Sequence, residues 1–133
     1  MVGEPPVLGR DEYEAKCDQI LEDPEIRFCG FIGADAGLIV GKFREGEEPI
    51  ETDENRRKMY HDLVTRITKR KVFDANLGRV KYSASRRERV VMMSFPVGDD
   101  VVMVMAQPRV NIDRTAYRII EKLGSQWSEF YGK

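Results

Sequence analysis

Hydrophobic positions in the first third of the chain change from helical to strand-like spacing. The first set recurs at three- and four-residue intervals and consists of Tyr13, Cys17, Ile20 and Leu21. This spacing predicts a helix that Asp11 caps and that ends before Pro24. Two short runs rich in aromatic and β-branched residues follow at 26–32 and 38–43, joined by the turn-forming sequence GADAG. Together they predict a β-hairpin.

The longest helical pattern begins after Thr52, which is placed to act as its N-cap. Acidic residues occupy the first turn and basic residues the last, so each charge suits its end of the helix dipole. One face is apolar and consists of Met59, Tyr60, Leu63, Val64 and Ile67. The pattern predicts an amphipathic helix that ends near residues 76–78.

Three strand patterns and one helix complete the chain. The strands are expected at residues 79–85, 89–95 and 101–106, and the helix from Asp113 through Trp127. The first strand alternates apolar Val80, Tyr82 and Ala84 with polar residues, whereas the other two are apolar on both faces. Strands of that kind need cover on both sides. The order α-β-β-α-β-β-β-α therefore predicts an α+β sandwich, a five-stranded, mainly antiparallel sheet with helices on its faces.

Length and composition agree with one domain. The chain has 133 residues, 41% of them hydrophobic, which is enough for a core without metal or disulfide support. We expect an extended leader at residues 1–10 and a single domain at residues 11–133. Cys17 and Cys29 fall in apolar patterns and are expected to be reduced, buried thiols. No apolar run approaches the length of a membrane span, so we expect a cytoplasmic protein without membrane insertion.

Charge is distributed unevenly along the chain although the net charge is only −1. Residues 1–55 carry 5 Lys or Arg and 15 Asp or Glu, whereas residues 56–89 carry 12 and 3. The basic segment predicts a candidate surface for an anionic partner, formed by Arg56, Arg57, Arg66, Arg70, Arg86 and Arg87. The basic segment could equally contact the acidic N-terminal third of this chain or of a second copy. Nucleic acid is less favoured because few aromatic residues accompany the basic ones.

No arrangement of residues predicts catalysis. The single histidine, His61, lies within the long helical pattern and has no nucleophile or acid at a recognisable spacing. One histidine and two separated cysteines do not form a zinc motif, and the glycines do not match a phosphate-binding loop. We therefore expect a protein that is not an enzyme, with no cofactor and no metal.

The hairpin sequence FCGFIGADAGLIVGKF, the long helix and the three closing strands resemble the roadblock/dynein-light-chain family over about residues 11–130. The segments DPEIRFCGFI and VKYSASRRERVVMMSFP are also similar to those of small proteins of ammonia-oxidising archaea. The first resemblance implies a profilin-like fold related to longin domains. It also implies a non-enzymatic scaffold.

In roadblock dimers, the strand after the long helix pairs with the same strand of the second subunit, and the two long helices lie side by side. Many of them are platforms or regulators for small Ras-like GTPases. The resemblance thus implies a homodimer whose interface contains Met59, Tyr60, Leu63, Ile67, Val80, Tyr82 and Ala84. Two other functions stay open at this point: a profilin-like or PAS-like sensor that binds a small ligand, and a nucleic-acid binder that uses residues 56–89.

Overall fold

Five antiparallel strands form one sheet in the order β2-β1-β5-β4-β3. The computed structural model describes residues 9–49 and 51–124. The elements are α1 (Arg10–Ile20), β1 (Ile26–Ile32), β2 (Leu38–Phe43), α2 (Asp53–Arg70), the 3-10 helix η1 (Lys71–Phe73), α3 (Asp74–Leu77), β3 (Ser83–Arg86), β4 (Val91–Val97), β5 (Asp100–Ala106) and α4 (Ile112–Leu123). The predicted fold class is confirmed.

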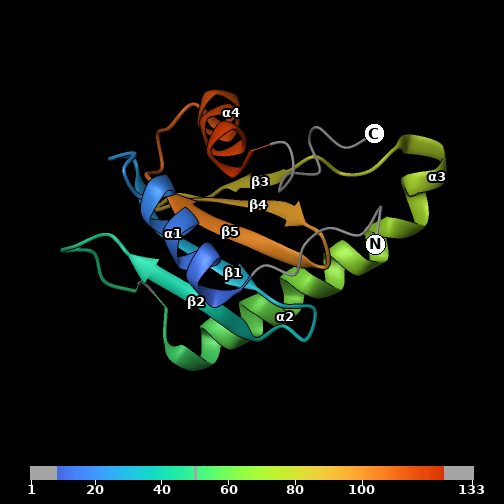
Figure 1. Ribbon diagram of the computed structural model, residues 1–133, viewed down its shortest axis with the longest axis horizontal. Coiled ribbons are helices and arrows are strands. Elements are labelled where there is room, and N and C mark those ends of the chain that lie inside the picture. Colours follow the sequence, from blue (N-terminus) through green and yellow to red (C-terminus); the bar gives the residue numbers. More distant parts are fainter. Residues whose placement is uncertain (1–8, 50, 125–133) are drawn as a thin grey trace.

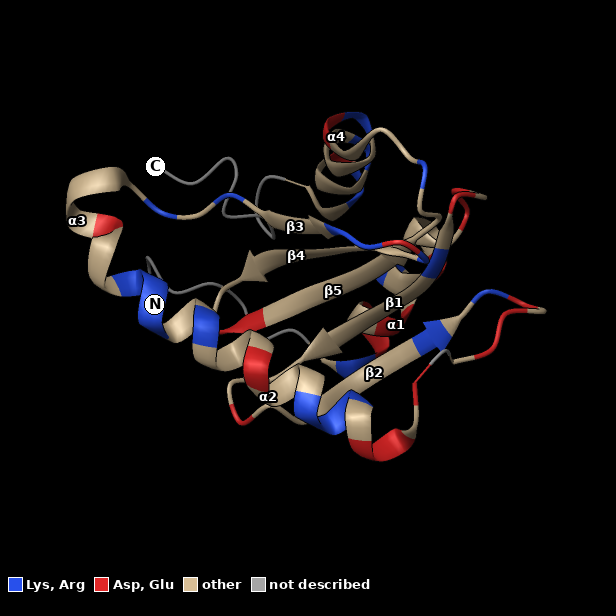
Figure 2. Ribbon diagram, turned by 180° about the vertical axis from the view of Figure 1, so that it is seen from behind, with Lys and Arg blue, Asp and Glu red and all other residues tan. Residues whose placement is uncertain are grey.

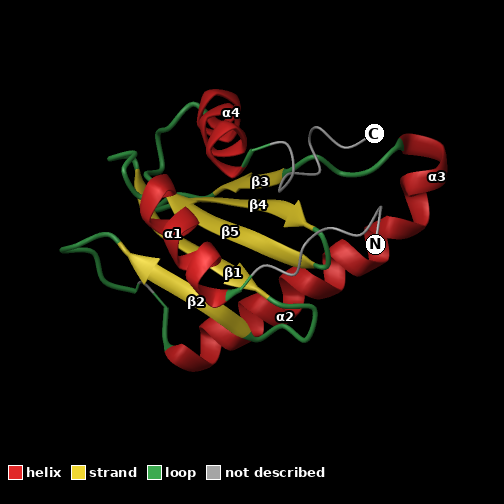
Figure 3. Cartoon of the chain, in the orientation of Figure 1, coloured by secondary structure: helices red, strands yellow, loops and turns green. Residues whose placement is uncertain are grey.

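Helices cover the two faces of the sheet unequally. Helices α1 and α4 lie on one face and α2 crosses the other (Figure 1, Figure 3). The α1–α4 side contains the larger core, with Phe31, Phe95 and Ile120 fully buried. On the α2 side, a smaller cluster joins the helix to Phe28 and Met103 of the sheet. The central strands are therefore buried on both faces, as their apolar sequences require.

The β1–β2 hairpin has the predicted bounds. Gly30 and Gly41 face each other in its register, and the Phe28 ring lies against both. A Cβ atom at Gly30 would approach Cζ of Phe28 to 2.8 Å, so the ring occupies the space that a side chain at this position would need. In the turn, the positive φ of 69° belongs to Ala36 rather than to a glycine.

Two helix starts differ from the predictions. Helix α1 begins at Arg10, and its N-cap is Gly9, two residues before the predicted cap Asp11, because the Gly9 carbonyl accepts the first helical bond from the Tyr13 amide. Asp11 is consequently inside the first turn. Helix α4 begins at Ile112 because the side chain of Asn111, not Asp113, accepts from a backbone amide. The Thr52 cap on α2 is confirmed, and Trp127 lies outside the described residues.

The long helix and the strand after it are both shorter than predicted. Helix α2 ends at Arg70 because the next positions of its apolar row are polar, and η1 and α3 carry the chain on to Gly78. Strand β3 begins only at Ser83. Continuing its register with β4 would set Lys81 opposite Pro96, which has no N–H to donate.

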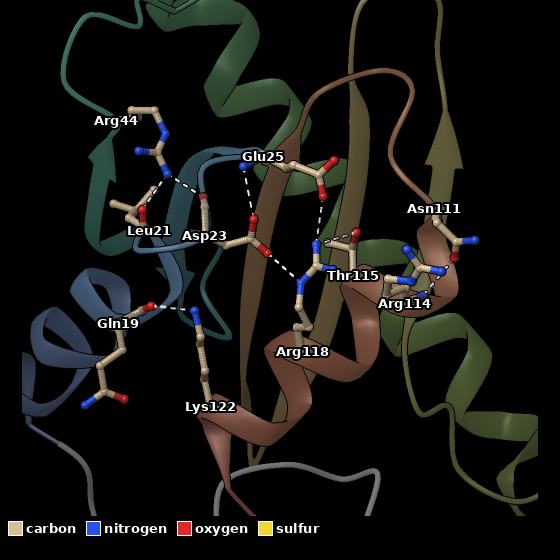
Figure 4. A network of polar contacts seen from close by, with 10 residues as sticks. All are labelled: Gln19, Leu21, Asp23, Glu25, Arg44, Asn111, Arg114, Thr115, Arg118 and Lys122. Carbon is tan, nitrogen blue, oxygen red and sulfur yellow. Dashed lines mark hydrogen bonds and ion pairs between the residues drawn. The ribbon is translucent and has the colours of Figure 1, made fainter.

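A polar network fixes the end of the sheet where α1 leads into β1 (Figure 4). Arg118 of α4 donates to Asp23 and Glu25, at 2.8 Å each. Arg44, at the end of β2, donates to the carbonyls of Leu21 and Asp23. These contacts hold three separate elements together around one short turn.

Candidate interaction surface

A groove runs between α2 and the β3–β4 half of the sheet. Its volume is about 1120 Å³, and it is open to solvent along the helix. Met59 and Ile67 line it from the helix, and Met92 lines it from β4. All three are half-buried apolar side chains on a surface that no other described element covers. Figure 2 shows this side of the sheet, with α2 in the foreground.

The helix residues predicted for an interface divide into two groups. Tyr60 and Leu63 are 5% and 9% exposed and pack against the protein's own sheet. Met59 and Ile67 line the groove as Leu63 does, but they keep more of their surface exposed. Only the second pair is available to another molecule without disturbing the core.

Two of the strand residues predicted for the interface, Tyr82 and Ala84, face the opposite side of the sheet. The Tyr82 hydroxyl donates to Asp113 of α4, and its ring packs on Phe95 with centroids 5.9 Å apart. Ala84 is exposed and pairs with Met93, which belongs to the α1–α4 core. Val80 precedes the strand and is half-buried. The polar residues of β3 therefore face the groove, and the outer edge of the strand pairs with no described segment.

Most of the predicted anion-binding arginines have intramolecular partners. Arg56 pairs with Asp53, and Arg66 pairs with Asp62 at 2.9 Å. Arg70 donates to Oγ of Ser83 at 2.8 Å, and Arg86 donates to the carbonyl of Val110 at 2.7 Å. Within the described part of the chain, only Arg57 and Arg87 of the six have no such contact and are exposed.

Sequence reasoning missed one surface feature, the segment formed by η1 and α3. Val72, Phe73 and Leu77 are 74%, 56% and 80% exposed there. The sequence contained a signal for it. Residues 70, 71 and 74, where the row of Met59, Leu63 and Ile67 would continue, are polar, which marks the point where the chain leaves the sheet.

No site chemistry beyond these surfaces is found in residues 9–49 and 51–124. No group of three His, Cys, Asp or Glu side chains there could hold a metal ion, and His61 is exposed on α2. No described helix is long and apolar enough to span a bilayer. A second hollow of about 430 Å³ at the C-terminal end of α2 contains charges of both signs, among them Lys71, Asp74 and Asp99. It shows no bias toward an anionic or a cationic ligand.

Comparison with known families gives a match over nearly the whole chain. The sequence profile described as "Family of unknown function (DUF6659)" covers residues 5–133. The chain belongs to the DUF6659 family. No curated protein matches this DUF6659 sequence.

Solved structures similar to the DUF6659 chain are roadblock-type proteins. The gliding protein MglB from Thermus thermophilus has a TM-score of 0.68 at 11% identity, over 96% of this chain and 93% of that one. The Roadblock/LC7 domain from Streptomyces avermitilis has a TM-score of 0.62 at 7% identity, over 82% and 89%. An MglB with a tetrameric arrangement has a TM-score of 0.63 at 9% identity, over 92% and 92%. At these identities the likeness defines the fold, which is the roadblock fold expected from the sequence.

Proposed function

We propose that this protein is a homodimeric, non-enzymatic scaffold that regulates a small Ras-like GTPase in the cytoplasm. The observation that carries the proposal is the open groove between α2 and β3. It leaves Met59, Ile67 and Met92 half-exposed beside a sheet edge with no described partner. Monomeric proteins seldom leave an apolar face next to an unpaired edge.

Pairing two β3 edges would join the two sheets into one of ten strands. Isologous pairing about a twofold axis would also bring the two grooves and the two α2 helices to the same side of that sheet. A stable interface buries on the order of 1,200–2,000 Å² in total, which a strand edge alone does not supply. The apolar side chains along the grooves supply the remaining contact area.

The charges of α2 favour an antiparallel pair of helices. Its first turn contains Asp53 and Glu54, and its last contains Lys69 and Arg70. Figure 2 shows the acidic residues at the start of the helix. Side-by-side antiparallel helices place each acidic end beside the partner's basic end. This placement offsets the repulsion between two helices that each carry more basic than acidic side chains.

A GTPase is proposed as the partner because the sequence resembles the roadblock family. An archaeal origin is proposed because two segments resemble those of small archaeal proteins. Arg57 and Arg87 remain exposed to contact an acidic surface of such a partner. A nucleic-acid role is disfavoured because most of the other basic side chains on this face already have partners within the chain.

Sedimentation equilibrium at micromolar concentration tests the dimer. We expect a dimer that Met59→Glu or Ile67→Glu dissociates, since each places a charge in the groove. Thr65→Glu, on an exposed position of α2 outside the groove, is the matched control and should leave the dimer intact. A wild-type protein that stays near 15.3 kDa at both low and high salt would contradict the proposal.

A purification from the native cell tests the partner. Tagged wild-type protein should retain a GTP-binding protein, and the purified pair should associate differently when the GTPase is loaded with GTP or GDP. Arg57→Glu/Arg87→Glu should weaken that association while leaving the dimer intact. Recovery of nucleic acid, released steeply with salt, would favour the alternative function instead.

A further inference from the structure

We propose that residues 71–77, here called the arm, bind the acidic segment 44–54 of a second copy of this chain. This inference rests on the proposed homodimer and adds to it a contact outside the α2–β3 face. Two sets of observations carry it. The arm displays apolar side chains that are exposed and that no other described element covers, and the complementary charges flank the opposite end of α2.

The apolar surface of the arm is unusual for this protein. Val72, Phe73 and Leu77 are three of the five exposed large hydrophobic residues among the described ones, and they lie within six consecutive positions. In Figure 1 the arm projects from the C-terminal end of α2, away from the sheet. Side chains exposed at that point do not contribute to the protein's own core. They are placed to contact another surface.

Charge defines which surface fits the arm. The arm itself carries one basic and one acidic side chain, and its flanks at 69–70 and 78–81 add four basic ones. Residues 44–54 carry six acidic side chains and one basic one. Among these acidic residues, Glu45 and Glu48 have no ion-pair partner in the described part of the chain. Pro49 next to them is exposed and offers an apolar contact.

Distance prevents the two segments from meeting within one chain. They flank the two ends of α2, whose 18 residues span about 27 Å. In an antiparallel pair of α2 helices the end of one lies beside the beginning of the other. Each arm would then reach the acidic segment of the partner, and the twofold axis would form the contact twice.

Charge reversal in mixed dimers tests the contact. Lys71→Glu reverses the arm side, and Glu45→Lys/Glu48→Lys reverses the acidic side. All three positions are exposed, so both variants should fold. Each variant alone should dimerise about tenfold more weakly at low salt. Their equimolar mixture should form heterodimers well above the statistical share, because reversed arms then face reversed segments. Native mass spectrometry counts the three species.

Matched controls separate this contact from the dimer itself. Arg114→Glu makes the same change in net charge as Lys71→Glu at an exposed position near the start of α4, on the opposite side of the sheet, and should leave dimerisation unchanged. A wild-type dimer with a statistical mixture of variants would overturn the arm contact alone. A wild-type monomer would overturn the proposed function.

An apolar tip flanked by basic residues is also the chemistry of binding to an anionic membrane. The double variant Phe73→Ser/Leu77→Ser distinguishes the two partners, with Leu38→Ser/Tyr117→Ser as the control at similarly exposed positions. We expect weaker dimers for the first variant and unchanged dimers for the control. Dimers of unchanged affinity, together with lost binding to phosphatidylglycerol vesicles, would overturn the proposal in favour of a lipid surface.

Discussion

Arg118 of α4 donates from Nε to Oδ2 of Asp23 at 2.8 Å and so links two segments 95 residues apart in the sequence. Asp23 is the buried member of the pair, with a side chain only 8% exposed, and its Oδ1 accepts from the Glu25 amide at 3.0 Å. Arg118 is 36% exposed and also binds Glu25. The carboxylate thus positions the turn between α1 and β1 under α4.

Replacement of Asp23 should destabilise the fold. We expect Asp23→Ala to lower the free energy of unfolding by about 1–3 kcal/mol, because a backbone amide and a guanidinium lose their acceptor. Glu25→Gln, at a side chain 48% exposed, should cost less than about 1 kcal/mol. Urea unfolding measures both values. Equal losses in the two variants would contradict the role given to Asp23.

The Phe28 ring over Gly30 predicts a steric effect that a second substitution relieves. Gly30→Ala should destabilise the protein by about 1–3 kcal/mol, because its Cβ would lie 2.8 Å from Cζ of Phe28. Phe28→Leu removes that ring atom at its own cost in packing. The double variant should therefore be more stable than the sum of the two single losses implies, as a double-mutant cycle measures. Strict additivity would contradict this geometry.

Periodicity was sufficient for the elements whose partners are close in sequence. The β1–β2 hairpin has its predicted bounds because each strand is a short apolar run ended by turn residues. The two central strands, apolar on both faces, implied helices on both sides, and α1, α2 and α4 supply them. Local sequence determines these features, so they can be predicted without the tertiary structure.

Features set by distant contacts could not be predicted in the same way. The row of Val80, Tyr82 and Ala84 was recognised as apolar, but its side of the sheet depends on Asp113 and Phe95, which are distant in sequence. Spacing alone also could not distinguish the neighbours Met59 and Tyr60. Met59 lines the groove, whereas Tyr60 is buried in the core. The residues predicted for the interface on this helix therefore include both core residues and residues that line the groove.

The two cysteines should react slowly in the native protein. Cys17 and Cys29 are fully buried free thiols, and Sγ of Cys17 lies 3.5 Å from the Cys29 carbonyl oxygen. Burial raises the pKa of Cys29 well above its usual value, which further lowers the thiolate fraction. We expect a disulfide reagent to modify them at least about a hundredfold more slowly than in urea. An exposed Thr65→Cys thiol in the folded protein is the control and should react at once.

Two tyrosines hydrogen-bonded to carboxylates should make the fold sensitive to alkaline pH. The Tyr13 hydroxyl lies 2.5 Å from Oδ2 of Asp100, and burial followed by this hydrogen bond raises the pKa of Tyr13 well above its usual value. The pKa of Tyr82 is raised to about 12, chiefly by the hydrogen bond it donates to Asp113. Above a pH of about 10, the unfolded chain releases these protons while the folded chain retains them. Stability should therefore fall as the pH rises from about 10 to 12.

Tyr13→Phe isolates the larger of these two shifts. The variant keeps the ring that stacks on Phe31, with centroids 3.9 Å apart, and removes only the hydroxyl. At a pH of about 8 it should be less stable than the wild type by about 1 kcal/mol, because Asp100 loses a donor. At a pH of about 11 the difference should shrink or reverse, since only the wild type has Tyr13 to ionise in the unfolded chain. Urea unfolding of both proteins at the two pH values measures the change. A constant difference would show that the Tyr13 hydroxyl titrates normally in the folded protein.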